Sequence, residues 1–203
     1  MSCTDTAIIL AGGKSSRMGF DKQFVEIDGI CITEYIIDLL RPIFKSIILV
    51  TSRPECYRNK KSVILAEDYY KDFGPLGGMH IGLAKSESQY NYMIACDMPY
   101  INKAYIDYMK KLLKEDNYRK SAVITRFGDW IEPFNAFYSK ALIPQIEENI
   151  LQKKQKISSL LFSSQVLYIE EQKARAFSPD WAMFTNLNKV EDLENLRLLK
   201  VGE

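Results

Sequence analysis

The chain has 203 residues, of which 47% are hydrophobic and 26% are charged. This length suits one α/β domain with a full core, so we expect residues 1–203 to form a single domain. The net charge of +1 provides no field of one sign for a nucleic acid or a membrane surface, so neither is an expected partner. An anionic ligand must therefore be held by local groups.

The number and spacing of the cysteine and histidine residues argue against a zinc site and against a redox-active cysteine pair. The four cysteines are irregularly spaced, and His80 is the only histidine. No apolar run approaches the roughly 20 residues of a membrane span, and the N-terminal residues lack the pattern of a signal peptide. We therefore expect reduced thiols and a cytoplasmic protein.

Short apolar runs alternate with amphipathic patterns along the chain. Strands are expected at residues 7–10, 46–51, 63–65, 91–96, 122–125, 133–138, 165–169 and 182–186. Helices are expected to begin near residues 32, 75, 102, 144 and 188. This alternation predicts a single-domain, three-layer α/β/α fold, Rossmann-like, with a mostly parallel sheet. Such sheets bind ligands at the C-terminal ends of their strands.

The first candidate motif follows the first strand directly. Residues 10–22 read LAGGKSSRMGFDK. Gly12 and Gly13 leave the backbone open, so that successive N–H groups can cradle an anion, while Arg17 and Lys22 add positive charge. A triphosphate needs both kinds of group. The segment is not a Walker A loop, because Ile8 stands where that motif has its first glycine.

The second candidate motif ends a later strand. Residues 91–100 read NYMIACDMPY, so Asp97 follows the apolar run and Pro99 prevents its simple continuation. Mg²⁺ prefers one or two carboxylates together with phosphate oxygens and water. Asp97 is therefore a candidate metal ligand; the alternative is that it merely caps the next turn.

The third candidate motif combines an acidic pair with a glycine turn. Residues 66–82 read AEDYYKDFGPLGGMHIG. Asp68 could accept hydrogen bonds from guanine or ribose, or it could be a solvated residue at a strand end. Gly77 and Gly78 would allow a close approach to the positive N-terminal end of the following helix.

Four segments together resemble the molybdenum cofactor guanylyltransferase family. Residues 10–22 resemble its L-A-G-G-x-S-x-R-M-G-x-D-K signature, and residues 96–99 resemble its C-D-x-P motif. Residues 67–78 resemble its E-D pair before a G-P-L-x-G turn, and residues 184–193 (FTNLNKVEDL) resemble its F-x-N-x-N-T-P-E-E-L ending. Residues 132–138, which begin with Glu132, are similar to a segment with acceptor-side contacts. The resemblance implies a fold of the nucleotide-diphospho-sugar transferase type.

The resemblance also implies an activity and its residues. The enzyme would transfer GMP from GTP to the phosphate of molybdenum-bound molybdopterin and release pyrophosphate. The implied GTP-binding residues are Leu10, Ala11, Gly12, Gly13, Lys22, Asp68 and Asp97. The implied catalytic residues are Lys22, Arg17 and Asp97, with Mg²⁺ on Asp97. The implied acceptor-binding residues are Gly77, Gly78, Asn186 and Asn188. Cofactor-delivery proteins or molybdoenzymes would be transient partners.

Two other functions stay open from the sequence. One is a related cytidylyltransferase or sugar-phosphate nucleotidyltransferase, against which the second glycine of the Gly12–Gly13 pair argues, because many cytidylyltransferases have a single glycine in an L-A-A-G loop. The other is a non-catalytic nucleotide-binding module, against which Asp97 and Lys22 argue. Asn188 likewise has a second interpretation, as the N-cap of the last helix.

Overall fold

The computed structural model describes residues 3–11, 22–27, 29–59, 62–70, 73–161 and 165–187. These residues form a seven-stranded sheet in the order β5-β4-β1-β6-β8-β7-β9. Its strands are β1 (Thr6–Ala11), β4 (Ser46–Thr51), β5 (Ile64–Ala66), β6 (Tyr90–Ala95), β7 (Ala122–Phe127), β8 (Trp130–Ser139) and β9 (Val166–Glu170). A separate hairpin consists of β2 (Glu26–Ile27) and β3 (Ile30–Cys31).

The strand directions divide this sheet into two parts. β5, β4, β1 and β6 are parallel to one another. β8 is antiparallel to both β6 and β7, whereas β9 is parallel to β7. The expectation of a mostly parallel sheet is therefore confirmed, with β8 as the reversed strand.

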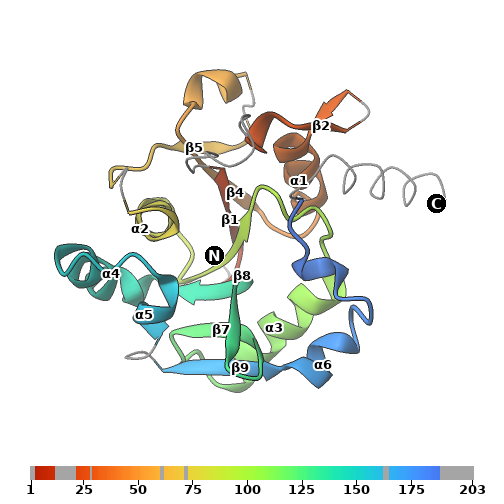
Figure 1. Ribbon diagram of the computed structural model, residues 1–203, viewed down its shortest axis with the longest axis vertical. Helices are drawn as coiled ribbons and strands as arrows, with labels where there is room; N and C mark the ends of the chain where they lie inside the picture. Colours follow the sequence, from red (N-terminus) through yellow and green to blue (C-terminus); the bar gives the residue numbers. More distant parts are fainter. Residues whose placement is uncertain are drawn as a thin grey trace.

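Two helical layers cover the sheet (Figure 1). α1 (Ile32–Leu40), α3 (Lys103–Glu115) and α6 (Glu171–Arg175) lie on one face, and α2 (Pro75–Lys85), α4 (Ile143–Leu151) and α5 (Ile157–Leu161) lie on the other. Because successive strand residues point to opposite faces, Ile9 packs under the first layer while Ile8 and Leu10 pack under the second. This confirms the three-layer α/β/α fold class.

Local sequence explains where the helices begin. Pro75 starts α2, where its missing N–H is no loss. Asn102 caps α3, since its side chain accepts a hydrogen bond from the Tyr105 N–H at 2.9 Å. The buried face of α3 then carries Tyr105, Ile106 and Met109. Four 3₁₀ turns complete the described elements: η1 (Lys22–Phe24), η2 (Pro54–Tyr57), η3 (Lys140–Leu142) and η4 (Ala182–Phe184).

One expected strand is wrong. Residues 182–184 form η4 rather than the start of a strand, and Trp181 before them has the left-handed φ of 67°. Met183 and Phe184 are both buried in the core beside α3, and a single 3₁₀ turn lets these neighbouring side chains pack there together. The expected final helix from residue 188 lies outside the described residues. Among those described, no helix is long and apolar enough to cross a membrane.

Candidate active site

The ends of β1 and β6 meet at one edge of the sheet. The Cys96 N–H donates a hydrogen bond to the Leu10 carbonyl at 3.0 Å, just beyond the last paired residues of the two strands. Asp97 is the next residue after Cys96, and Gly12 follows Ala11 at the end of β1. The start of the glycine-rich segment and the candidate metal ligand are therefore neighbours, although the chain separates them by more than 80 residues.

The other end of the glycine-rich segment is anchored at the same edge. Lys22 begins η1, and Gln23 after it is only 1% exposed. The Gln23 side-chain oxygen accepts a hydrogen bond from the hydroxyl of Thr51, the last residue of β4, at 2.6 Å. The Gln23 carbonyl accepts from the hydroxyl of Thr33 at 2.9 Å. These bonds fix the backbone next to Lys22 at the C-terminal end of β4.

Asp68 follows β5 and lies against the first turn of α2. Its Oδ1 accepts a hydrogen bond from the Tyr70 N–H at 2.8 Å. A Cβ atom on Gly77 would lie 2.6 Å from Asp68 Oδ1 and 2.7 Å from the Tyr70 carbonyl oxygen, both closer than real contacts allow. Gly77 is therefore required for the Asp68 loop to approach the positive end of α2.

The next glycines of α2 bring this helix onto the sheet. A Cβ atom on Gly78 would lie 3.3 Å from Leu10 Cδ2, and one on Gly82 would lie 2.6 Å from Ile8 Cγ2. Gly78 and Gly82 therefore serve close packing of α2 on β1. The acceptor role expected of Gly77 and Gly78 stays a prediction.

The C-terminal segment after η4 returns to Asp97. The Leu187 N–H donates a hydrogen bond to the Asp97 carbonyl at 2.8 Å. Asn186, the residue before it, is exposed, and the Asp97 side chain is half-buried. The segment that resembles the family ending thus reaches the candidate metal ligand.

A second carboxylate lies near Asp97. Burial, and then the negative charge of Asp97, raise the pKa of Glu132 to about 7, although the hydrogen bond that its carboxylate accepts from the Phe134 N–H at 3.1 Å opposes this. A divalent cation at this position would relieve the repulsion between Asp97 and Glu132. In the described part of the chain no group of three or more acidic, cysteine or histidine side chains could hold a metal ion.

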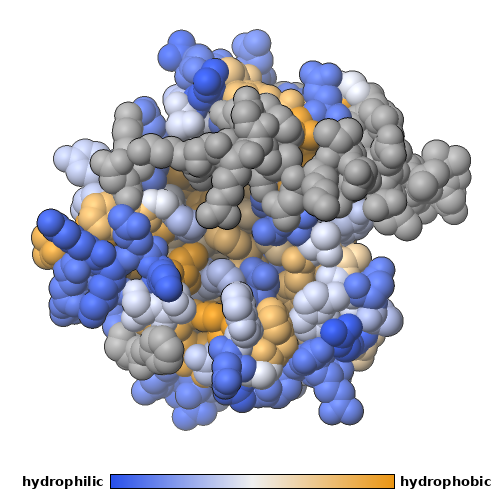
Figure 2. Space-filling view, viewed as in Figure 1, coloured by the Kyte–Doolittle hydropathy of each residue, from blue (hydrophilic) through white to orange (hydrophobic). Residues whose placement is uncertain are grey.

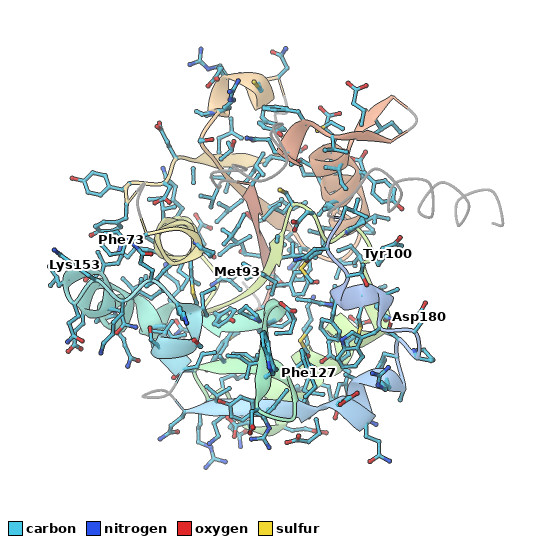
Figure 3. The ribbon with its side chains drawn as sticks, in the orientation of Figure 1. Phe73, Met93, Tyr100, Phe127, Lys153 and Asp180 are labelled. Atoms are coloured by element: carbon cyan, nitrogen blue, oxygen red, sulfur yellow. The ribbon has the colours of Figure 1, made fainter. Side chains whose placement is uncertain are left out.

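The view in the figures faces this edge of the sheet. In Figure 3, Phe73 before α2, Tyr100 after β6 and Phe127 at the end of β7 surround the centre of the view. Phe73 and Tyr100 come after the C-terminal ends of β5 and β6, and Phe127 is the last residue of β7. Figure 2 shows hydrophobic residues at the centre of this face, with hydrophilic residues around them. The described part of this face therefore offers apolar contact area with hydrophilic residues around it.

The structure brings together most of the described residues that the sequence singled out. Leu10, Ala11, Asp68 and Asp97 lie at the ends of β1, β5 and β6, and Asn186 joins them through Leu187. Four other expected residues, Gly12, Gly13, Arg17 and Asn188, lie outside the described residues. The side chain of Lys22 is also not described.

Sequence reasoning missed three residues that shape this edge: Gln23, Thr51 and Asn135. Each is a polar side chain that is 0–1% exposed, and each joins elements distant in sequence. Only Asn135 leaves a trace in the sequence, because it interrupts an apolar strand pattern in which asparagine is disfavoured.

A mostly parallel three-layer fold with a glycine-rich segment, a strand-end aspartate and an acidic pair at one edge defines a nucleotidyltransferase. Residues 7–167 match the model of the MobA-like NTP transferase domain. The chain is 48% identical over 192 residues to the molybdenum cofactor guanylyltransferase of Syntrophotalea carbinolica, covering 95% of this chain and 90% of that protein. It is 50% identical over 194 residues to a probable molybdenum cofactor guanylyltransferase of Peptoclostridium acidaminophilum, with coverage of 93% and 86%. The chain therefore belongs to the molybdenum cofactor guanylyltransferase family.

Solved structures agree on the fold. The molybdopterin-guanine dinucleotide biosynthesis protein A of Archaeoglobus fulgidus superposes with a TM-score of 0.82 at 23% identity, covering 98% of this chain and all of that one. A 4-diphosphocytidyl-2C-methyl-D-erythritol synthase of Anaerococcus prevotii gives a TM-score of 0.67 at 14% identity, with coverage of 98% and 96%. Enzymes of this kind generally act with a divalent metal ion.

Proposed function

We propose that this protein transfers GMP from GTP to the terminal phosphate of molybdenum-bound molybdopterin, as a single domain over residues 1–203 acting in the cytoplasm. The observation that carries this proposal is the junction of β1 and β6, where the Cys96 N–H meets the Leu10 carbonyl. It puts the start of the glycine-rich segment beside Asp97. The names of the relatives at 48% and 50% identity support guanine as the base and molybdopterin as the acceptor.

The nucleotide side consists of the β1 end and the segment that follows it. Leu10, Ala11, Gly12 and Gly13 would contact GTP through the backbone, and Arg17 and Lys22 would neutralise its phosphates. Asp68 would accept from the guanine or ribose. It is suited to this because the backbone at Tyr70 and Gly77 holds it in place.

Asp97 would hold Mg²⁺. Glu132 lies close enough to Asp97 for the negative charge of Asp97 to raise its pKa. When bound, the ion would offset negative charge on the triphosphate. The acceptor would lie on the other side of Asp97, against Asn186 and Asn188, and would extend across the site to reach Gly77 and Gly78 at the N-terminal end of α2, beside Asp68. Cofactor-delivery proteins or molybdoenzymes would meet the enzyme only transiently.

The chemistry needs positioning more than proton transfer. A phosphate oxygen of the acceptor attacks the α-phosphorus of GTP, a new P–O bond forms, and the bond to the bridging oxygen breaks, so that pyrophosphate leaves. The attacking oxygen is already an anion, so no strong general base is required. Lys22 and Arg17 would stabilise the charge that develops on pyrophosphate.

The decisive experiment is incubation of the protein with GTP, Mg²⁺ and molybdenum-loaded molybdopterin, followed by mass analysis. We expect the guanine dinucleotide and one pyrophosphate for each product molecule. A parallel reaction with CTP tests the cytidylyltransferase alternative, which shares the fold. Tight GTP binding without pyrophosphate release would contradict the proposal in favour of a non-catalytic module.

A further inference from the structure

β8 is irregular where it passes the end of β6. Its partner β7 pairs Val123 with Phe137 and Thr125 with Glu132, so Ile124 alone lies opposite residues 133–136 of β8. Asn135 lies within this bulge, has the left-handed φ of 51° and is 1% exposed. Bulges of this kind often re-aim a side chain beside an active site. A buried, non-glycine residue with positive φ persists only where its surroundings hold it.

Asn135 is held by two hydrogen bonds to elements far away in the sequence. Its Oδ1 accepts from the hydroxyl of Tyr92 in β6 at 2.7 Å, and its Nδ2 donates to the Met183 carbonyl in η4 at 3.1 Å. Both ends of the buried amide are therefore used. Glycine would suit the left-handed backbone at a lower cost, but it would make neither bond.

A second hydrogen bond attaches the same segment four residues after Met183, at Leu187. Leu187 donates its N–H to the Asp97 carbonyl at 2.8 Å. Tyr92 belongs to β6, and Asp97 follows the end of the same strand. Residues 183–187 are thus attached to β6 and its extension at two points, once through Asn135 and once directly, with Asn186 between the two.

We propose that Asn135 is a positioning residue: it holds the 183–187 segment against the end of β6 and so sets Asn186 in place for the phosphate of the acceptor. This role rests on the proposed guanylyl transfer. Asn135 touches neither substrate, and it acts on the acceptor side only. GTP contacts the opposite side of the site, at the ends of β1, β4 and β5.

The test compares Asn135→Gly with Asn91→Ala, a matched control. Asn91 is also a buried asparagine with side-chain hydrogen bonds, to Ser86 and Ser88, but it lies at the opposite end of β6. Asn135→Gly keeps the backbone conformation and removes both hydrogen bonds. We expect it to lower kcat/KM for the acceptor roughly 10- to 100-fold, the effect of a small displacement of a positioned group. The Kd for GTP should stay within about twofold, because the nucleotide side is untouched.

Hydrogen exchange provides a readout that needs no substrate. The Leu187 amide should exchange faster in Asn135→Gly and at the wild-type rate in Asn91→Ala, because only the first change releases the segment. Asn135→Asp should be at least as impaired as Asn135→Gly, since an oxygen would face the Met183 carbonyl. Tyr92→Phe leaves the bond to Met183 in place and should lie between Asn135→Gly and wild type; it carries the test if the glycine variant does not fold.

Three outcomes would overturn the inference: unchanged exchange at Leu187, unchanged acceptor kinetics in a destabilised Asn135→Gly protein, or an equal loss of GTP and acceptor affinity. A wild-type protein that forms no dinucleotide would instead overturn the proposed function. The exchange at Leu187 would then still decide whether Asn135 holds the segment.

Discussion

The two parts of the sheet build the two sides of the site in different ways. In the part formed by β5, β4, β1 and β6, the strands are parallel and pair in unbroken register. The C-terminal ends of β1 and β6 are by themselves enough to place Leu10 near Asp97. In the part formed by β8, β7 and β9, the register skips, and a buried residue has positive φ. The proposed nucleotide side thus follows from regular topology, whereas the proposed acceptor side depends on a local irregularity.

The forces that hold the two sides together differ as well. Where α2 packs on β1, Gly78 faces the apolar side chain of Leu10 and Gly82 faces that of Ile8. On the acceptor side, a buried amide and a carboxylate with a raised pKa take part. Apolar packing tolerates small shifts, but a buried polar group that loses its partner is costly. We therefore expect the effect of a substitution at the α2–β1 contact to depend mainly on side-chain volume, and the effect of one at Asn135 or Glu132 to depend mainly on the polar groups that it removes.

The largest effect is expected where the two sides meet. Asp97→Asn should lower the rate of dinucleotide formation by on the order of 10³-fold, because a metal ion contributes several kcal/mol of charge stabilisation. The fold should persist, since Leu187 bonds to the main-chain oxygen of residue 97. Mass analysis of the product and thermal unfolding check both points. A variant that reacts at the wild-type rate would place the metal elsewhere.

Lys22→Ala tests the nucleotide side by charge. We expect the barrier to rise by about 2.7–4 kcal/mol, as for other electrostatic catalytic groups. The control is Lys45→Ala, an exposed lysine next to the N-terminal end of β4, paired with Asp5 at the opposite edge of the sheet. Steady-state kcat with saturating GTP separates the two variants. Normal turnover by the Lys22 variant would remove this residue from the reaction.

Gly77→Ala and Gly82→Ala test the same side by volume. Each introduces a Cβ atom 2.6 Å from its nearest neighbour, Asp68 Oδ1 for the first and Ile8 Cγ2 for the second. Both should lower the free energy of unfolding by about 1–3 kcal/mol through overpacking.

Only Gly77→Ala displaces Asp68. It should therefore raise the Kd for GTP about tenfold, a change of about 1.4 kcal/mol, whereas Gly82→Ala should not. Calorimetric titration with GTP measures the Kd, and urea unfolding measures the free energy of unfolding. Equal GTP affinities in the two variants would show that Asp68 does not contact the nucleotide.

The last prediction concerns stability alone, on the acceptor side. The pKa of Glu132 is raised from its ordinary value of 4.5 to about 7, so the folded protein keeps a proton that the unfolded chain releases. This contribution to stability is present below pH 4.5 and is lost as the pH rises to about 7. Glu132→Gln should remove the slope, a difference in the free energy of unfolding of at most about 3.5 kcal/mol at about 1.4 kcal/mol per pKa unit.

Urea unfolding with EDTA and without nucleotide, over this pH range, measures that slope. Glu87→Gln alters an exposed carboxylate and should leave the slope as in the wild type. If the free energy of unfolding of the wild type rose from pH 4.5 to about 7 relative to that of Glu132→Gln, the expected sign of the slope would be wrong.

Particular elements show which parts of the fold could be predicted from the sequence. The strands at 46–51 and 91–96 and the N-cap at Asn102 were predicted because they depend on local patterns: apolar runs and a capping side chain. The strand expected at 182–186 was wrong, because Met183 and Phe184 take the conformation that the core beside α3 allows. Tertiary packing outweighed a short apolar pattern there.

By itself, the sequence determined the seven strands of the main sheet in their order along the chain and the residues that stand at strand ends, since hydrophobic periodicity and glycine or proline positions are local properties. It thereby also marked Asp68 and Asp97. Only the tertiary structure decided that Gln23 would fasten η1 to Thr51, that Glu132 would lie near Asp97, and that Asn135 would join β6 to η4. These contacts span 28 to 48 residues or cross the sheet, and a hydrogen bond between distant buried groups leaves no periodic trace in the chain.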